Sequence, residues 1–86
     1  MIPPRTPDRL AEDARRGREA FERHVRPHLR PEDDGKFVAI DMDTGAYEID
    51  LDEYAAIMRL RARVPAADIW LERAGSPAAI RIGSAR

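Results

Sequence analysis

The sequence predicts a small α+β domain with elements in the order α-β-β-α-β-β. Two segments carry apolar residues at three- and four-residue steps, the spacing of amphipathic helices. Four short segments alternate apolar and polar residues, as strands do. Two of these strand segments are separated only by a short turn sequence around Gly45, which favours a hairpin. We therefore expect a single small sheet with one helix packed on a face and an N-terminal helix or arm.

The size and composition of the chain limit its class. Its 86 residues correspond to one domain with a modest core, so self-association or a partner would add stability. The absence of cysteine excludes a disulfide framework and any thiolate metal site. No apolar run approaches the roughly 20 residues that span a bilayer, and the first residues lack the apolar core of a signal peptide. A cytoplasmic location is the resulting expectation.

The N-terminal region divides into a proline-rich tail over residues 1–7 and a helix or arm over residues 8–31. Thr6 is the expected N-cap, and Pro27 should end the regular helix near residue 25. The apolar stripe of this helix consists of Leu10, Ala14, Gly17, Phe21, Val25 and Leu29. Because the stripe is thin, two arrangements stay open: the helix packs on its own domain, or it orders on a partner.

The core domain is expected over residues 36–83 and begins with a hairpin. Its strands are predicted at Phe37–Met42 and Tyr47–Asp50, with Gly45 supplying a positive φ in the turn. On the first strand, Val38, Ile40 and Met42 should face one way and Phe37, Ala39 and Asp41 the other.

The second helix begins directly after the hairpin and should end before Pro65. Asp50 is the predicted N-cap, with Glu53 completing a capping box, and Ile49 and Tyr54 are predicted to form a hydrophobic staple. The face expected to cover the sheet comprises Leu51, Tyr54, Ala55, Met58 and Ala62, with Ile57 beside it.

Two further strands are predicted at residues 68–74 and 79–83, joined by a turn at Gly75-Ser76-Pro77. Trp70, on the first of them, is most simply a core residue, or an interface anchor if that face of the sheet is open. That face should be covered by the N-terminal helix or by a second copy of the chain.

Charge follows a basic–acidic–basic pattern. Residues 1–30, 31–58 and 59–86 carry net charges of +3, −8 and +4, which sum to −1. The pattern predicts charge complementarity within the fold or with a partner. Arg9, Arg16, Arg23 and Arg30 fall seven residues apart, as in a basic ridge that could bind nucleic acid. Acid-first pairs at four-residue spacing, Glu12/Arg16, Glu19/Arg23 and Glu22/Arg26, favour a solvated face over that alternative.

Two short motifs suggest chemistry only weakly. Asp43-Thr44-Gly45 matches the core of retroviral-type aspartic proteases, but that reaction needs a second such aspartate, and a hairpin turn is favoured. His24 and His28 have metal-ligand spacing, but Pro27 disturbs it and no third ligand is evident. We expect no catalytic, cofactor or metal residues.

A family of small uncharacterised bacterial proteins resembles this chain in four segments: Gly35–Asp41 (GKFVAID), Thr44–Asp50 (TGAYEID), Arg59–Arg63 (RLRAR) and Pro77–Gly83 (PAAIRIG). Members of that family are often encoded beside a retropepsin-like aspartic protease, in pairs that resemble toxin–antitoxin operons. The resemblance implies an antitoxin-like protein with a protein partner. It also implies that Asp43 is not catalytic, because the family commonly has Glu-Thr-Gly at this turn.

The expected function is that of a non-enzymatic protein-interaction module that self-associates or binds a partner protein, and a nucleic-acid-binding regulator is the alternative. The predicted partner-binding residues are the helix and strand hydrophobics Phe21, Val25, Leu29 and Trp70 and the arginines Arg9, Arg16 and Arg23.

Overall fold

The computed structural model describes residues 7–75 and 79–84, with side chains over residues 11–75 and at Ile82. It has the predicted α+β class. Its regular elements are α1 (Pro7–Ala20), β1 (Phe37–Asp41), β2 (Tyr47–Asp50), α2 (Glu53–Arg63), β3 (Asp68–Arg73) and β4 (Ala79–Ser84). The predicted order did not include the irregular helical turns between α1 and β1. No described helix has the length and apolar character needed to cross a membrane. The predicted cap Thr6, the tail before it and the Ser76-Pro77 turn lie outside the described residues.

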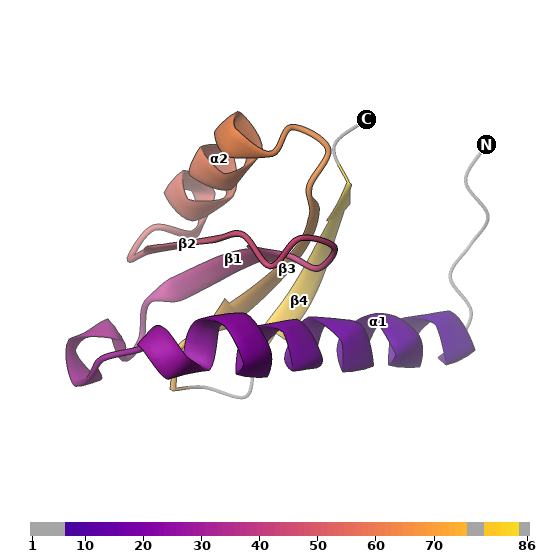
Figure 1. Cartoon of the computed structure of the whole chain (residues 1–86), viewed down its shortest axis with the longest axis horizontal. Helices are drawn as coiled ribbons and strands as arrows, with labels where there is room; N and C mark the ends of the chain where they lie inside the picture. Colours follow the sequence, from indigo (N-terminus) through magenta and orange to yellow (C-terminus); the bar gives the residue numbers. More distant parts are fainter. Residues whose placement is uncertain (1–6, 76–78, 85–86) are drawn as a thin grey trace.

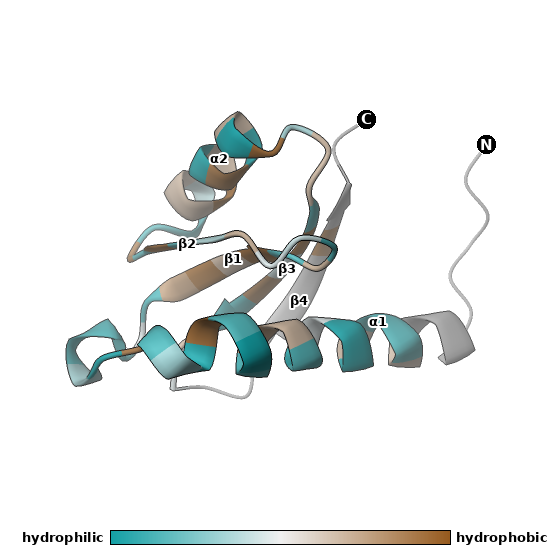
Figure 2. Ribbon diagram, in the orientation of Figure 1, coloured by the Kyte–Doolittle hydropathy of each residue, from teal (hydrophilic) through white to brown (hydrophobic). Residues whose placement is uncertain are grey.

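The four strands form one antiparallel sheet in the order β2-β1-β3-β4. The two helices lie on opposite sides of this sheet (Figure 1). Hydropathy follows this layering, with hydrophobic residues on β1 between the helices and hydrophilic residues along much of α1 (Figure 2). Each sheet face therefore has its own core. One core contains Ala20, Phe21, Val25, Val38, Ile40, Trp70 and Ala74, and the other contains Ala39, Ala56, Leu60, Ala67, Ile69 and Leu71.

α1 packs on the sheet of its own chain, which decides between the two arrangements that the sequence left open. Gly17 makes this possible, because a Cβ built on it would lie 2.1 Å from Cδ2 of Trp70. The glycine therefore lets the helix backbone approach the indole ring closely. The predicted stripe is correct at Gly17, Phe21 and Val25, but Ala14 is exposed and Asp13 is buried in its place.

The end of α1 differs from the prediction of a regular helix to about residue 25. The α-helix ends at Ala20 and continues as a π turn over Phe21–Val25, closed by the Arg26 N–H donating to the Phe21 carbonyl. Short 3₁₀ turns follow at Arg26–His28 and Pro31–Asp33. Pro27 lacks the N–H that a regular helix would need at this point, so the α-helical hydrogen-bond pattern cannot continue past it.

The hairpin forms as predicted, with Gly45 at a φ of +83°. The alternation on β1 is also correct, because Val38 and Ile40 pack toward α1 and Ala39 packs toward α2. Asp41 organises the turn from a buried position. Its carboxylate accepts hydrogen bonds from the Asp43 N–H, the Thr44 hydroxyl and the Asp68 N–H at 3.2, 2.7 and 3.1 Å.

α2 is present where predicted, but both its cap and its buried face were predicted wrongly. The N-cap is Asp52, whose side chain accepts from the Tyr54 N–H at 3.1 Å. Asp50 instead accepts from the Asp52 N–H and belongs to β2. The predicted staple does not form, because Ile49 packs in the core on the α1 side and Tyr54 is exposed. The residues that face the sheet are Ala56 and Leu60, with Ile57 and Val64 beside them.

Candidate functional site

The most distinctive surface of the described chain is an apolar ridge on the outer side of α2. It consists of Leu51, Tyr54, Met58 and Ala62, and we call it the α2 ridge. Leu51, Tyr54 and Met58 are 73%, 67% and 46% exposed, and they are three of the four large hydrophobic residues exposed in the described part. Tyr54, Met58 and Ala62 are four residues apart on one face of α2, and Leu51 lies just before the N-cap residue Asp52. Clustered large hydrophobics on a surface commonly mark an interaction site.

The orientation of α2 explains why this face is outward. Arg59 and Arg63, on the flank of the helix, reach the edge strand β2. Arg59 donates to Glu48 and Asp50 carboxylates at 3.0 and 2.7 Å, and Arg63 pairs with Glu48. We call this group of two arginines and two acids the arginine clamp. It fixes the helix about its axis with Ala56 and Leu60 inward, so the opposite side must face solvent.

The electrostatics of the clamp favour its ionised form. Partial burial raises the pKa of Glu48, but hydrogen bonds and charge from Arg59 and Arg63 outweigh it, and the pKa lies below its ordinary value. The pKa of Asp50 is lowered by the hydrogen bond from the Asp52 N–H and by Arg59. The pKa of Arg59 is raised by hydrogen bonds to Asp50 and Glu48. Glu48, Asp50 and Arg59 therefore stay charged at neutral pH.

The same arginines also close the exposed edge of β2. Arg59 donates to the Ile49 carbonyl at 2.8 Å, and Arg63 donates to the Tyr47 carbonyl at 3.1 Å. Free carbonyls on an edge strand are a template for pairing with another strand. Because both carbonyls have guanidinium donors, β2 offers little to an added strand. The apolar ridge is then the more available surface on this side of the molecule.

The hydrophobic residues predicted to bind a partner lie in the core of this fold. Phe21, Val25 and Trp70 are buried between α1 and the sheet, and Leu29 is half-buried against the same core. The Trp70 Nε1–H donates to the Glu72 carboxylate at 2.9 Å, which holds the ring in place. The core interpretation of Trp70 is thus confirmed. None of the three buried side chains is available at the surface unless α1 leaves the sheet.

The predicted arginine ridge is divided by ion pairs. Arg16 bridges α1 to the hairpin turn, 2.8 Å from Asp43 and 3.8 Å from Asp68. Arg30 lies 3.9 Å from Glu32, and the side chain of Arg9 lies outside the described part. Of the three predicted four-residue pairs, the described ion pairs include only Glu22/Arg26, while Arg15 pairs with both Glu12 and Glu19. These pairs satisfy charges that would otherwise be available to phosphates.

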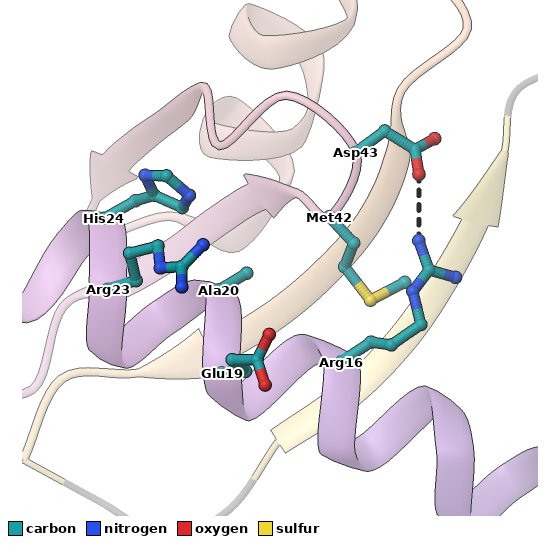
Figure 3. Close-up of a pocket in the computed structure, with 7 residues that line it drawn as sticks. All are labelled: Arg16, Glu19, Ala20, Arg23, His24, Met42 and Asp43. Atoms are coloured by element: carbon teal, nitrogen blue, oxygen red, sulfur yellow. Dashed lines mark hydrogen bonds and ion pairs between the residues drawn. The ribbon is translucent and has the colours of Figure 1, made fainter.

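The structure brings Arg16 and Arg23 together at a shallow hollow between α1 and the hairpin turn (Figure 3). The hollow measures about 160 Å³ and is lined by Arg16, Glu19, Ala20, Arg23, His24, Met42 and Asp43. Figure 3 shows the Arg16–Asp43 ion pair across one end of it. The lining is mixed in charge, and the two arginines share it with Glu19 and Asp43. It presents no concentration of one charge that would select an anion.

The Asp-Thr-Gly turn has a structural role in the described chain. Asp43 is exposed and forms an ion pair with Arg16. The Thr44 hydroxyl donates a hydrogen bond to the Asp41 carboxylate. Burial, with help from the carboxylates of Asp43, Asp13 and Asp41, raises the pKa of Asp68, while Arg16 opposes this. Within the described residues, no group of three or more acidic, histidine or cysteine side chains is arranged to hold a metal ion.

Sequence reasoning identified the members of the α2 ridge but assigned them to the core. A signal was present in the acidic residues of β2. Glu48 and Asp50 alternate with Tyr47 and Ile49, so they must point to the α2 side of the sheet. A helix resting there would place its arginines over them, and this fixes which face remains outward.

Comparison with known proteins adds no further assignment: no protein family, curated protein or solved structure matches this chain.

Proposed function

We propose that this protein is an interaction module that binds another protein chain through the α2 ridge. The observation that carries the proposal is the exposure of Tyr54 and Met58 on one face of α2, and of Leu51 just before it, while Ala56 and Leu60 on the opposite face are buried. Large aromatic and flexible apolar residues of this kind are enriched at the centres of protein interfaces.

The surroundings of the ridge support this role. The arginine clamp ties α2 to β2, so binding at the ridge does not have to order the helix itself. The clamp also places charged groups along one flank of the α2 ridge, as at the polar rim of an interface. The hollow between α1 and the hairpin turn, by contrast, is small and of mixed charge.

The resemblance to the bacterial family extends the proposal. On that basis, an antitoxin-like role with a retropepsin-like protease as partner is a specific form of the same function. It rests on the resemblance, whereas the ridge rests on the exposure of its side chains.

A site-specific photo-crosslinker tests the proposed function. The photoreactive amino acid p-benzoylphenylalanine is placed at position 54 and the chain is produced in its native host, followed by irradiation and analysis of adduct masses. Discrete protein adducts are expected at position 54. The control is the same amino acid at position 14, where Ala14 is exposed on α1. Absence of adducts at position 54, or equal adducts at both positions, would count against a role for the ridge.

A further inference from the structure

We propose that Met58 is an oxidation site and that its sulfoxide switches off binding at the α2 ridge. This regulation rests on the proposed function. Met58 is 46% exposed and lies four residues from both Tyr54 and Ala62, so its thioether occupies the middle of the helical part of the ridge. An oxygen atom added to this sulfur changes the surface that a partner protein contacts.

Met58 is the side chain that a two-electron oxidant reaches first among the described residues. The chain has no cysteine, the usual target of such oxidants. Trp70 is 5% exposed and packs in the core on the α1 side. Met42 is half-buried against the same core, and Met1 lies outside the described residues. Oxidation is therefore directed to the α2 ridge and away from the core.

The reaction with hydrogen peroxide transfers one oxygen atom to the thioether of Met58. A lone pair of the sulfur attacks one peroxide oxygen, the O–O bond breaks, an S–O bond forms and water leaves. The sulfur is oxidised by two electrons and the peroxide is reduced by two. A methionine sulfoxide reductase reverses the change with a dithiol as reductant: the sulfoxide oxygen leaves as water and the dithiol becomes a disulfide. Both states of the ridge are therefore accessible.

The sulfoxide changes the polarity of the ridge at its centre. A thioether is apolar and flexible, whereas a sulfoxide is polar and accepts hydrogen bonds. A partner that covers the ridge with apolar side chains removes water from this oxygen without supplying a donor. One unsatisfied polar group of this kind should weaken binding by roughly tenfold or more.

The same oxygen should leave the fold unchanged. Ala56 and Leu60 pack against the sheet from the opposite face of α2, and the arginine clamp holds its flank. Met58 lies on the outer side, where its sulfoxide stays hydrated in the free chain. Oxidation of Met58 therefore acts on binding and not on stability, which oxidation of a core methionine would not achieve.

Peptide mass mapping of the full chain tests the oxidation site. The purified chain is treated with hydrogen peroxide for increasing times, catalase removes the peroxide, and the sulfoxide content of each methionine peptide is measured. Met58 should be oxidised roughly threefold faster than Met42 or more, and the two rates should become equal in urea, where neither side chain is covered. Equal rates in the folded chain overturn the proposal. The urea midpoint of the chain oxidised at Met58 should stay near that of the untreated chain.

Photo-crosslinking tests the switch. p-Benzoylphenylalanine is placed at position 51, seven residues before Met58, and the purified chain is treated with peroxide, freed of it and irradiated in an untreated lysate of the native host. The oxidised chain should give roughly tenfold fewer discrete adducts than the untreated chain. Methionine sulfoxide reductase with dithiothreitol should restore them.

Two matched variants identify the methionine responsible. Met58→Leu keeps the ridge apolar and forms no sulfoxide, so its adducts should survive peroxide treatment. Met42→Leu retains Met58 and should remain as sensitive to peroxide as the wild-type chain. A loss of adducts on oxidation of Met58→Leu overturns the proposal, because the sensitive group then lies elsewhere.

The cross-linking result separates this proposal from the proposed function. Adducts that persist undiminished once Met58 is fully oxidised overturn the switch and leave the interaction role standing. Adducts that fall on oxidation and return on reduction support both. An untreated chain that gives no adducts at position 51 or position 54 overturns the interaction role and the switch together.

Discussion

Replacing Gly17 with alanine should destabilise the fold, although helix propensity alone predicts the opposite. In an exposed helix, alanine is more favourable than glycine by about 1 kcal/mol. At position 17 the added methyl group would lie 2.1 Å from Cδ2 of Trp70 and 2.5 Å from two further ring carbons. Carbon atoms in contact stay about 3.5–4.0 Å apart, so α1 or the indole ring must move by about 1.5 Å.

The structure allows little room for that movement. Trp70 is 5% exposed and its Nε1–H is bonded to the buried carboxylate of Glu72. Overpacking of this kind typically costs about 1–3 kcal/mol. Loss of the hydrogen bond between Trp70 and the buried Glu72 side chain adds to this cost. After subtraction of the gain in propensity, we expect a net loss of about 1–2 kcal/mol of unfolding free energy.

Urea denaturation followed by far-UV circular dichroism measures this loss. With an m value of about 1–2 kcal/mol/M for a small protein, the midpoint should fall by roughly 1 M. Ala14→Gly, at an exposed position of the same helix, serves as the matched control and should cost about 1 kcal/mol through propensity alone. A rise in the midpoint of Gly17→Ala would refute the close packing of α1 on Trp70.

A double-mutant cycle identifies the cause. In a Trp70→Leu background the ring is gone, so Gly17→Ala should become neutral or stabilising by up to about 1 kcal/mol. If the cost of Gly17→Ala is the same with and without Trp70, the clash is not with the indole ring.

Two further predictions concern buried and paired carboxylates. The pKa values of Glu48 and Asp50 lie below their ordinary values of 4.5 and 3.8, so their contribution to stability is present above those values and lost as pH falls through the lower folded-state pKa values. Arg59→Gln should therefore lower the urea midpoint at pH 7 and lower it progressively less as the pH falls below 3.8; a loss that does not change with pH would show that the clamp does not act through ionised carboxylates. Asp41→Asn turns an acceptor of three hydrogen bonds into a group with a competing donor, and should cost about 2–3 kcal/mol in urea denaturation. Thr44→Val, which removes one of those bonds, should cost about 1 kcal/mol, and a smaller loss for Asp41→Asn than for Thr44→Val would contradict the organising role of Asp41.

Local rules were sufficient where the outcome depends on a few neighbouring residues. The turn at Gly45 follows from its freedom to adopt positive φ, and the alternation of Val38, Ala39 and Ile40 follows from the pleat of a strand. The presence of α2 was also predictable, since a long periodic segment ends at Pro65. Its cap was assigned two residues too early because Asp50 and Asp52 are both good capping residues.

The candidate site could not be predicted in the same way, because α2 carries apolar residues around most of its circumference. Tyr54 and Met58, with Leu51 just before the helix, are larger than Ala56 and Leu60, and hydrophobicity alone places the larger side chains inward. The ion pairs of Arg59 with β2 settle the rotation, and they depend on a contact between separate elements.

The sequence by itself determined the α+β class, the hairpin and the presence of α2, because these depend on periodicity and backbone freedom over a few residues. Only the tertiary structure decided that α1 packs on its own sheet and that the apolar ridge of α2 faces solvent. The first depends on a glycine meeting Trp70, 53 positions further along the chain. The second depends on Arg59 and Arg63 reaching the carboxylates and carbonyls of β2. Both are long-range contacts, whose geometry exists only once the sheet has formed.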